Sequence, residues 1–464
     1  MIKKLINIEF GRVLSKPLPW VLFFITLRLI LLFKAKEMNS HLGGEDGDRY
    51  LNEAMNLIKY KIFAYINADP PLPSAYDMPL YPFWLAGLIL ITNNIDTAVV
   101  MASVMNCIFF GFASFAIYRL SLQLLKNKLI GLLAIIIFSS FPETYPYTIY
   151  YMPDILFLAL FTWSLFFFID YFQCCSKKSL VVSSLLLGLS ALTKPVGIMF
   201  ITFSLLSIFV WFILKRREVI KGIQALLIMF SIFSAILSPW VVRNFITFGE
   251  LGTSTIFGTN LFDYNYRYML KSKFPNTLDA QLQFENNFLE KREKILKVLT
   301  KEQRLNPMIV SDKLGSFAKS EILSNFTEYI ETVVKRHPRL YFGTGTIALF
   351  NLLGDNRIVD DMKQFVSGQI KWNALPQRAQ IVQSVSWSIL IILYVVAFFG
   401  GTRLILKKNW IPLCILLIIY VYFTILIGPI PLTRYRIMLL PSLSILGAYG
   451  LFSLIKKNNN QLVK

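Results

Sequence analysis

Long apolar runs recur along the chain and alternate with short polar loops. Several of these runs reach about 18 or more residues, which is close to the ~20 that a membrane-spanning helix needs. A shorter run at 79–92 contains two prolines near its start and suits an interfacial helix better than a span. The predicted spans lie at about 17–35, 97–118, 129–147, 154–172, 180–194, 196–214, 222–242, 384–403, 410–428 and 437–455. We therefore expect an all-α polytopic membrane protein with about ten transmembrane helices.

Composition and charge agree with this class. The chain is 55% hydrophobic and 16% charged, whereas soluble domains contain about 25% charged residues. Its net charge of +20 comes from basic clusters in alternate loops: Lys3, Lys4, Arg119, Lys126, Lys128, Lys177, Lys178, the segment 215–221, Lys407, Lys408, Lys456 and Lys457. Basic loops stay on the cytoplasmic side and are held by anionic lipid. This predicts a multi-pass protein of the cell membrane with both termini inside, and gives no indication of nucleic-acid binding.

Two large segments then fall on the extracytoplasmic side. The first is the loop 36–96, which belongs to an N-terminal transmembrane module at 1–242. The second is 243–382, which is long enough to form a small domain rather than a linker. The remaining residues, 383–464, contain the last transmembrane helices.

Charged residues near the outer ends of the predicted spans are the informative ones, because ionisable groups beside hydrocarbon are costly and usually functional. Two are acidic: Asp46, flanked by Glu45 and Asp48 in the first outer loop, and Asp154 at the start of a span. Four are basic: Lys194, Arg243, Arg434 and Arg436. Arginine holds phosphate through a bidentate fork and lysine acts as a point charge. Together these residues predict a carboxylate-lined cavity beside an anion-binding wall.

Simpler interpretations remain open for each residue taken alone. The acidic stretch is also compatible with a solvated turn or with a hard-cation site. Asp154 follows a proline, as acids at helix N-termini often do. Lys194 is compatible with a lysine that extends from a helix end to the interface. His41 and His337 are the only histidines, so no histidine cluster for a metal is expected, and no cofactor is predicted.

Several phrases in order resemble one enzyme family. They include "GGEDGDRYLNEA", "PLYPFWLAGL", "YMPDILF", "GLSALTKPVG", "PWVVRNFITFG", "RHPRLY" and "RYRIMLLPSLSILGAYGL". This order is similar to the membrane glycosyltransferases of the GT-C type, and above all to glycosyltransferase family 39. That family includes protein mannosyltransferases and lipid A aminoarabinose transferases. The resemblance covers nearly the whole chain, with 265–335 its least typical part.

The resemblance implies a GT-C bundle with interfacial helices in the first outer loop and a small extracytoplasmic domain. It also implies a donor sugar on a polyprenyl phosphate and an acceptor that is a glycan, lipid or protein. The essential acid of the first loop maps onto Asp46, with Asp48 as an alternative, and the second acid onto Asp154. The lipid-phosphate contacts map onto Lys194, Arg243 and, among the "RYR" arginines, Arg434 before Arg436.

A mechanism follows as a hypothesis. Asp46 accepts the proton of the acceptor hydroxyl while that hydroxyl displaces the lipid phosphate, with inversion at the anomeric carbon. Asp48, Tyr50 and Tyr81 are candidates for further substrate contacts. A lipid or sugar transporter or flippase is one alternative, although no repeated halves are evident. A surface polysaccharide polymerase or ligase is another, and it is expected to work without an acid in the first loop.

Overall fold

A computed structural model describes residues 16–44, 46–66, 68–214, 219–275, 277–430 and 432–462. Predictions that concern Lys3, Lys4, Glu45 and the basic residues at 215–218 lie outside these ranges, as do those on the side chains of Lys456 and Lys457. The described residues form helices and no β-strand.

Seven of the ten predicted spans are helices long and apolar enough to cross a membrane. They are α2 (Pro17–Glu37), α5 (Ile95–Leu125), α8 (Asp154–Cys174), α10 (Val196–Leu214), α11 (Val219–Phe248), α20 (Gln377–Leu406) and α21 (Trp410–Ile427). The other three are shorter or less apolar, and appear as α6 (Lys128–Ser140), α9 (Lys177–Thr193) and α22 (Leu440–Leu462). The prediction of an all-helical polytopic membrane protein is confirmed for the described residues.

One predicted span differs from the structure. The segment 129–147 is not a single helix, because α6 ends at Ser140 and a separate short helix, α7 (Thr144–Ile149), follows. Phe141 precedes Pro142 and is extended, with φ −64° and ψ 124°. A residue before proline is pushed out of the helical region, which explains the break.

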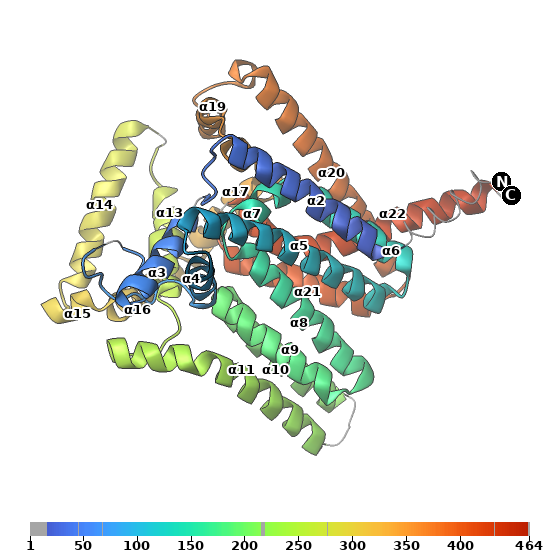
Figure 1. Cartoon of the computed structure of the whole chain (residues 1–464), viewed down its shortest axis with the longest axis horizontal. Coiled ribbons are helices and arrows are strands. Elements are labelled where there is room, and N and C mark those ends of the chain that lie inside the picture. Colours follow the sequence, from blue (N-terminus) through green and yellow to red (C-terminus); the bar gives the residue numbers. More distant parts are fainter. Residues whose placement is uncertain are drawn as a thin grey trace.

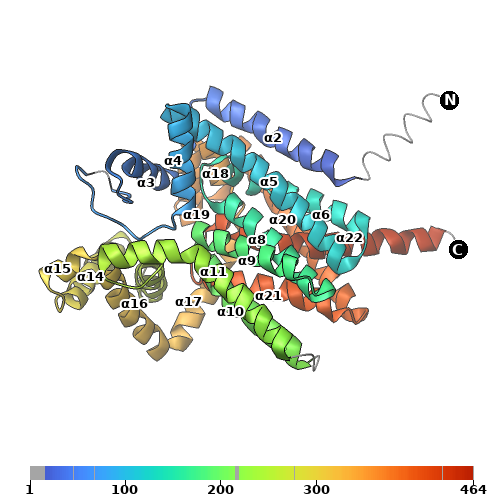
Figure 2. The same ribbon diagram turned by 60° about the horizontal axis from the view of Figure 1, so that its bottom comes forward.

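The segment 36–96, predicted as the first outer loop, contains two helices, α3 (Gly47–Tyr60) and α4 (Leu80–Thr92). The second of these is the predicted short helix. Figure 1 shows α3 and α4 at the same end of the bundle as α14, α15 and α16, away from the end where α22 finishes. The turned view in Figure 2 has the same arrangement. The first loop and the large loop between α11 and α20 therefore meet at one end of the molecule.

The large loop between α11 and α20 folds into further helices with apolar cores of their own. One core is built around Phe262, Tyr266, Phe284 and Phe288 and another around Phe350 and Met362. The helices are α12 (Ile256–Asn260), the π-helix η1 (Leu261–Tyr266), α13 (Arg267–Lys271), α14 (Leu278–Leu296), α15 (Lys301–Leu305), α16 (Pro307–Ser324), α17 (Phe326–Phe342), α18 (Thr346–Leu352), α19 (Asn356–Ser367) and the short η2 (Trp372–Ala374).

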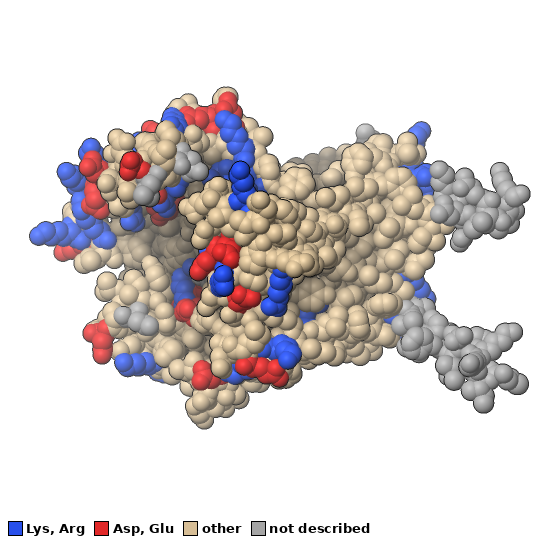
Figure 3. All heavy atoms as spheres, turned by 90° about the horizontal axis from the view of Figure 1, so that it is seen from above, with Lys and Arg blue, Asp and Glu red and all other residues tan. Residues whose placement is uncertain are grey.

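The surface has the charge distribution of a membrane protein. Figure 3 shows acidic and basic side chains gathered at the end that carries the outer loops, and next to it a broad band without charge. At the opposite end of this face the visible charged side chains are basic. A band of this kind matches a hydrocarbon belt between two polar regions.

Candidate active site

Asp46 stands in a tight turn directly before α3. Gly44 in this turn has φ +63°, a left-handed conformation that glycine adopts without strain. A Cβ atom at Gly47 would lie 2.8 Å from the ring of Tyr151, so the turn packs directly against the segment that precedes α8. The Tyr151 backbone N–H donates to the Leu42 carbonyl at 3.1 Å. The glycine-rich sequence thus holds the Asp46 turn close to the start of α8.

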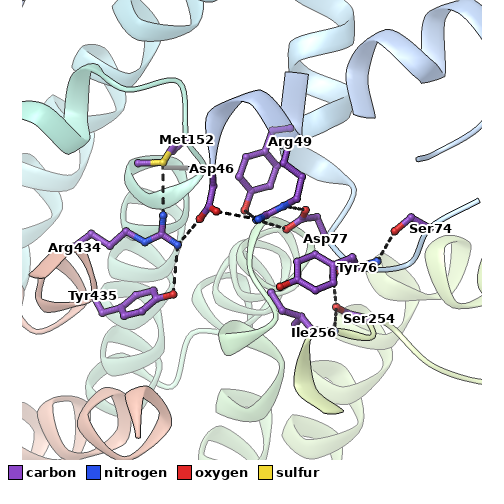
Figure 4. A network of polar contacts seen from close by, with 11 residues as sticks. Asp46, Arg49, Ser74, Tyr76, Asp77, Met152, Ser254, Ile256, Arg434 and Tyr435 are labelled. Carbon is purple, nitrogen blue, oxygen red and sulfur yellow. Dashed lines mark hydrogen bonds and ion pairs between the residues drawn. The ribbon is translucent and has the colours of Figure 1, made fainter. Parts of the chain in front are cut away.

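The Asp46 carboxylate lies between two arginines. Its Oδ2 is 2.5 Å from Arg434 Nη2, and its Oδ1 is 2.9 Å from Arg49 Nη1. Although Asp46 occupies the position before the first residue of α3, its side chain makes no capping hydrogen bond to that helix. Both oxygens therefore point toward the charged cluster instead of the helix terminus (Figure 4).

A second ion pair joins α8 to the break between α9 and α10. Lys194 Nζ is 2.7 Å from Asp154 Oδ1, and the two side chains are 15% and 2% exposed. Lys194 is extended, with φ −144° and ψ 135°, because it precedes Pro195 and cannot continue α9. The helix break thus releases the lysine side chain at the place where Asp154 begins α8.

The two ion pairs belong to one cluster. The ring of Tyr435 lies 5.1 Å from the Arg434 guanidinium carbon and 5.8 Å from Lys194 Nζ. Arg434 Nη1 also approaches the sulfur of Met152, two residues before Asp154, at 3.8 Å. The structure therefore brings together Asp46, Asp154, Lys194 and Arg434, which come from four distant parts of the sequence.

Three further residues of the first loop complete this cluster, and the sequence analysis did not single them out. Arg49 Nε donates to Asp77 Oδ2 at 2.5 Å and Arg49 Nη2 donates to Asp77 Oδ1 at 3.1 Å, in a bidentate pair. Glu53 lies one turn further along α3 and is fully buried. The spacing of Asp46, Arg49 and Glu53 at every third or fourth position was the available signal, because it places them on one side of a helix start.

The pKa values of the acids in the first loop are shifted in different directions. Burial alone raises the pKa of Asp46, but the charges of Arg434 and Arg49 outweigh it, so that the pKa lies below its ordinary value. For Asp77, burial dominates over the charge of Arg49 and the pKa is raised. Burial, helped by the charge of Asp77, raises the pKa of Glu53 well above its ordinary range. The surroundings of Asp46 thus favour its ionised form, whereas those of Glu53 favour its neutral form.

Arg243 lies beside the first loop rather than in contact with Asp46. Its Nη1 donates to the Ser74 carbonyl at 2.8 Å and its Nη2 to the Phe63 carbonyl at 3.4 Å. It also lines a mainly apolar groove of about 550 Å³ between the first loop, α9 and α11. The groove residues include Leu57, Phe63, Pro73, Leu80, Phe83, Leu192, Ile236, Pro239 and Trp240. Leu192, which lines the groove, is two residues from Lys194 of the charged cluster.

Arg436 has a different environment from Arg434. Its side chain is fully buried and forms an ion pair with Glu143, which is equally buried. It also donates to the carbonyls of Tyr341 at 2.6 Å and Gly343 at 2.8 Å. These protein acceptors occupy the guanidinium, so the predicted role of Arg436 in phosphate binding has no support in this geometry. Its contacts instead connect α7, α17 and the segment before α22.

The remaining predicted contacts lie at the edge of the cluster or behind it. Asp48 is 63% exposed and accepts a hydrogen bond from the Tyr151 hydroxyl at 2.8 Å. Its other neighbour is His41, at 3.1 Å. Tyr50 and Tyr81 are buried and pack edge to face, with ring centroids 5.7 Å apart. Tyr50 also accepts a hydrogen bond from Arg49 at 3.4 Å, so these tyrosines pack behind Arg49, whereas Asp48 contacts Tyr151 and His41.

No group of three or more potential metal ligands occurs among the described residues. His337, which comes from the large outer loop, lies 3.0 Å from the Gly428 carbonyl through its Nε2. His337 therefore contributes to the contact between α17 and the loop after α21.

Residues 75–242 match the family model described as "Dolichyl-phosphate-mannose-protein mannosyltransferase". This agrees with the resemblance in the sequence for that part of the chain, which is less than half of the whole. No curated protein matches the chain significantly in sequence. Among solved structures, ArnT from Cupriavidus metallidurans bound to undecaprenyl phosphate matches with 12% identity and a TM-score of 0.37, over 94% of this chain and 78% of that one. The apo state of ArnT matches with 14% identity and a TM-score of 0.36, over 93% and 77%.

The helical membrane architecture and a buried cluster of paired charges at one end define a multi-pass membrane protein with a polar site next to the bilayer. Within this architecture, residues 75–242 are the part that is similar to the mannosyltransferase family model.

Proposed function

We propose that the protein transfers a sugar from a polyprenyl-phosphate donor to an acceptor hydroxyl on the extracytoplasmic face. The convergence of Asp46 and Asp154 with Lys194 and Arg434 is the observation that carries this proposal. Such a reaction needs a carboxylate for the attacking hydroxyl and cations for the departing phosphate. Both kinds of group occur here within one cluster, and an outer-face location follows from the positive-inside rule.

In the proposed reaction, the acceptor oxygen attacks the anomeric carbon from the side opposite the phosphate. The new carbon–oxygen bond forms as the bond to the phosphate oxygen breaks, and the phosphate leaves with the electron pair. The hydroxyl proton passes to Asp46. Each carboxylate oxygen has two acceptor positions, so Asp46 can accept this proton while it remains paired with Arg49 and Arg434. Direct displacement inverts the anomeric configuration.

Lys194 and Arg434 would hold the phosphate and stabilise the charge that grows on its leaving oxygen. Removal of one such donor typically lowers the rate by about 10²–10³-fold. Asp154 would position Lys194, and Arg49 would position Asp46. Arg436 is left out of the phosphate set, because its guanidinium is occupied by Glu143 and backbone carbonyls.

The apolar groove beside Arg243 is suited to the polyprenyl chain. Its lining is predominantly aliphatic and aromatic and comes from the first loop, α4, α9 and α11. An isoprenoid chain would gain apolar contacts there without leaving the membrane. Arg243, at the rim, would then keep the first loop in place and contribute positive charge near the phosphate.

The test compares Asp46→Asn with Asp48→Asn in membranes that contain lipid-linked sugars. Asp46→Asn should remove sugar transfer while the protein stays inserted and folded, and Asp48→Asn should keep most of it. Full activity in Asp46→Asn would eliminate Asp46 from the mechanism. Loss in Asp48→Asn alone would identify Asp48 as the functional acid. Accumulation of a lipid-linked sugar in cells that lack the protein provides an independent readout.

A further inference from the structure

A π-helix in the large outer loop lies against the charged cluster. The segment η1 (Leu261–Tyr266) follows α12, and π-helical turns occur frequently at functional sites. Tyr264 within it is 36% exposed, whereas Phe262 and Tyr266 on either side are fully buried in the core of the outer loop. The π-helix thus buries the rings of Phe262 and Tyr266 in the core and leaves the ring of Tyr264 partly exposed.

Hydrogen bonds attach the residues just before α12, the helix that leads into this segment, to the first outer loop. The Thr255 backbone N–H donates to the Ala75 carbonyl at 2.8 Å, and the Ser254 hydroxyl donates to the Tyr76 carbonyl at 2.5 Å. The Tyr76 ring in turn lies 5.1 Å from the guanidinium carbon of Arg49 and 5.7 Å from the ring of Tyr65. One flank of the π-helix is therefore tied to the residues that hold Asp46.

The other flank contacts the loop that leads to Arg434. A Cβ atom at Gly428 would lie 2.6 Å from Asn265 Oδ1, so the π-helix and this loop are in close contact. The Tyr329 hydroxyl donates to the same Asn265 oxygen at 2.7 Å and fixes its position. Arg336 Nε donates to the Pro429 carbonyl at 2.9 Å and reinforces the junction. Tyr264 therefore lies between the segment that contains Tyr76 and the segment that contains Tyr435.

The electrostatic surroundings of Tyr264 are consistent with this position. Burial raises the pKa of its hydroxyl, and the neighbouring Tyr435 and Asp46 raise it further. The hydroxyl of Tyr76 is affected in the same direction, chiefly by burial and also by Tyr264. In Figure 4 the hydroxyls of Tyr76 and Tyr435 point toward each other across the space next to Asp46. Three partly exposed tyrosines therefore surround the open side of a buried ion-pair cluster.

We infer that Tyr264, Tyr76 and Tyr435 form a carbohydrate-binding wall that holds a sugar ring against Asp46 and Arg434. This inference rests on the proposed function and adds the role of the outer loop to it. A tyrosine offers an apolar face for the C–H groups of a sugar ring and a hydroxyl for hydrogen bonding, with little conformational freedom to lose. Ligand sites typically combine such aromatic walls with a few polar groups.

The arrangement also assigns a purpose to the large outer loop. Tyr76 belongs to the first loop and Tyr435 to the segment before α22, whereas Tyr264 comes from the loop between α11 and α20. The first loop would supply the acid, and the break after α9 and the segment before α22 would supply the phosphate-binding cations. The outer loop would supply the third ring and with it part of the selectivity for the sugar.

The experiment uses the full-length protein, with lipid-linked sugars extracted from cells that lack it as donor and undecaprenyl phosphate as a sugar-free competitor. Tyr264→Leu should raise the KM for the lipid-linked sugar by about tenfold and leave the inhibition constant of undecaprenyl phosphate unchanged. Tyr264→Phe keeps the ring and should retain most of the affinity. Tyr268→Leu is the matched control, because Tyr268 lies on the next turn with its ring 3.6 Å from the Arg336 guanidinium carbon.

The outcomes separate the inference from the proposed function. A rise in the KM of the acceptor instead of the donor would also support the wall, and would assign the bound ring to the acceptor. Equal KM values of Tyr264→Leu and the wild-type protein for both substrates would overturn the inference. A parallel loss of inhibition by undecaprenyl phosphate in Tyr264→Leu would also overturn it. Absence of sugar transfer by the wild-type protein would count against the proposed function itself. In that case the wall would still be supported if the extracted lipids raised the melting temperature of the wild-type protein but not that of Tyr264→Leu.

Discussion

Arg434 Nη2 lies 2.5 Å from Asp46 Oδ2, although the two residues come from opposite ends of the chain. The contact joins the first outer loop to the segment η3 (Thr433–Met438) before the last helix. Asp46 keeps a second partner in Arg49, so that either arginine can be changed without leaving the carboxylate without a cation. This makes the role of Arg434 accessible to mutation.

Arg434→Gln should move the acid limb of the pH–activity profile upward. The charge of Arg434 helps to keep the pKa of Asp46 below its ordinary value of 3.8. A carboxyl with a lowered folded-state pKa stabilises the protein above its unfolded pKa, and this stability is lost as pH falls through the folded-state pKa. Without Arg434 the same protonation takes place at higher pH. The profile of residual kcat/KM measures the shift.

Other acids in the site titrate in both proteins, so the difference between the two profiles is the informative quantity. Asp77 and Glu53 have raised pKa values and are present in each. Arg378→Gln provides a control, because Arg378 at the start of α20 is 61% exposed and pairs with Asp355 rather than with a residue of the charged cluster. An unchanged acid limb in Arg434→Gln would mean that ionisation of Asp46 does not limit the reaction.

Lys194→Met should lower both stability and sugar transfer. The change leaves the buried Asp154 carboxylate without its cation, and breaking a buried ion pair costs about 3–5 kcal/mol of unfolding free energy. The double variant Asp154→Asn with Lys194→Met removes both charges and should recover most of the melting temperature in detergent. It should stay inactive, because the phosphate then lacks its lysine. Recovery of transfer by the double variant would contradict phosphate binding by Lys194.

Arg436→Met and Arg434→Met should have opposite consequences. Arg436 is the sole cation paired with the fully buried Glu143 in the described structure, so its loss should cost about 3–5 kcal/mol and reduce the yield of folded protein. Arg434→Met leaves Asp46 paired with Arg49 and should fold, but lose transfer. Thermal melting and membrane activity of the two variants measure this contrast. If the Arg436→Met protein were stable but inactive, Arg436 would have to be counted among the substrate-binding residues.

Arg243→Gln should weaken binding of the donor more than binding of the acceptor. The charged guanidinium donates to the carbonyls of Ser74 and Phe63, and a hydrogen bond from a charged group contributes about 1.5–3 kcal/mol. Its loss should loosen the loop next to the apolar groove and raise the donor KM by about tenfold or more. Steady-state kinetics with each substrate varied in turn provides the measurement. A change confined to the acceptor KM would separate Arg243 from the lipid phosphate.

The sequence by itself determined the class of protein and most of the helices. Apolar runs of bilayer length can only be satisfied as helices in a membrane, since the backbone has no water to bond there. Proline positions also fixed local breaks: Lys194 precedes Pro195 and must leave the helix. The break at Pro142 was missed, because its flanking runs read as one apolar span. The acids Asp46 and Asp154 were visible as costly charges near hydrocarbon.

Only the tertiary structure decided which charges meet. Arg434 and Arg436 are two residues apart and equally basic, yet one faces Asp46 and the other Glu143. The sequence has no periodicity that distinguishes them, because the 3₁₀ turn of η3 and the packing of α7 and α17 set their directions. Asp77 and Tyr264 were overlooked for the same reason. Each has an ordinary sequence environment, and its position results from loops folded over the end of the bundle, where contacts between distant segments decide the geometry.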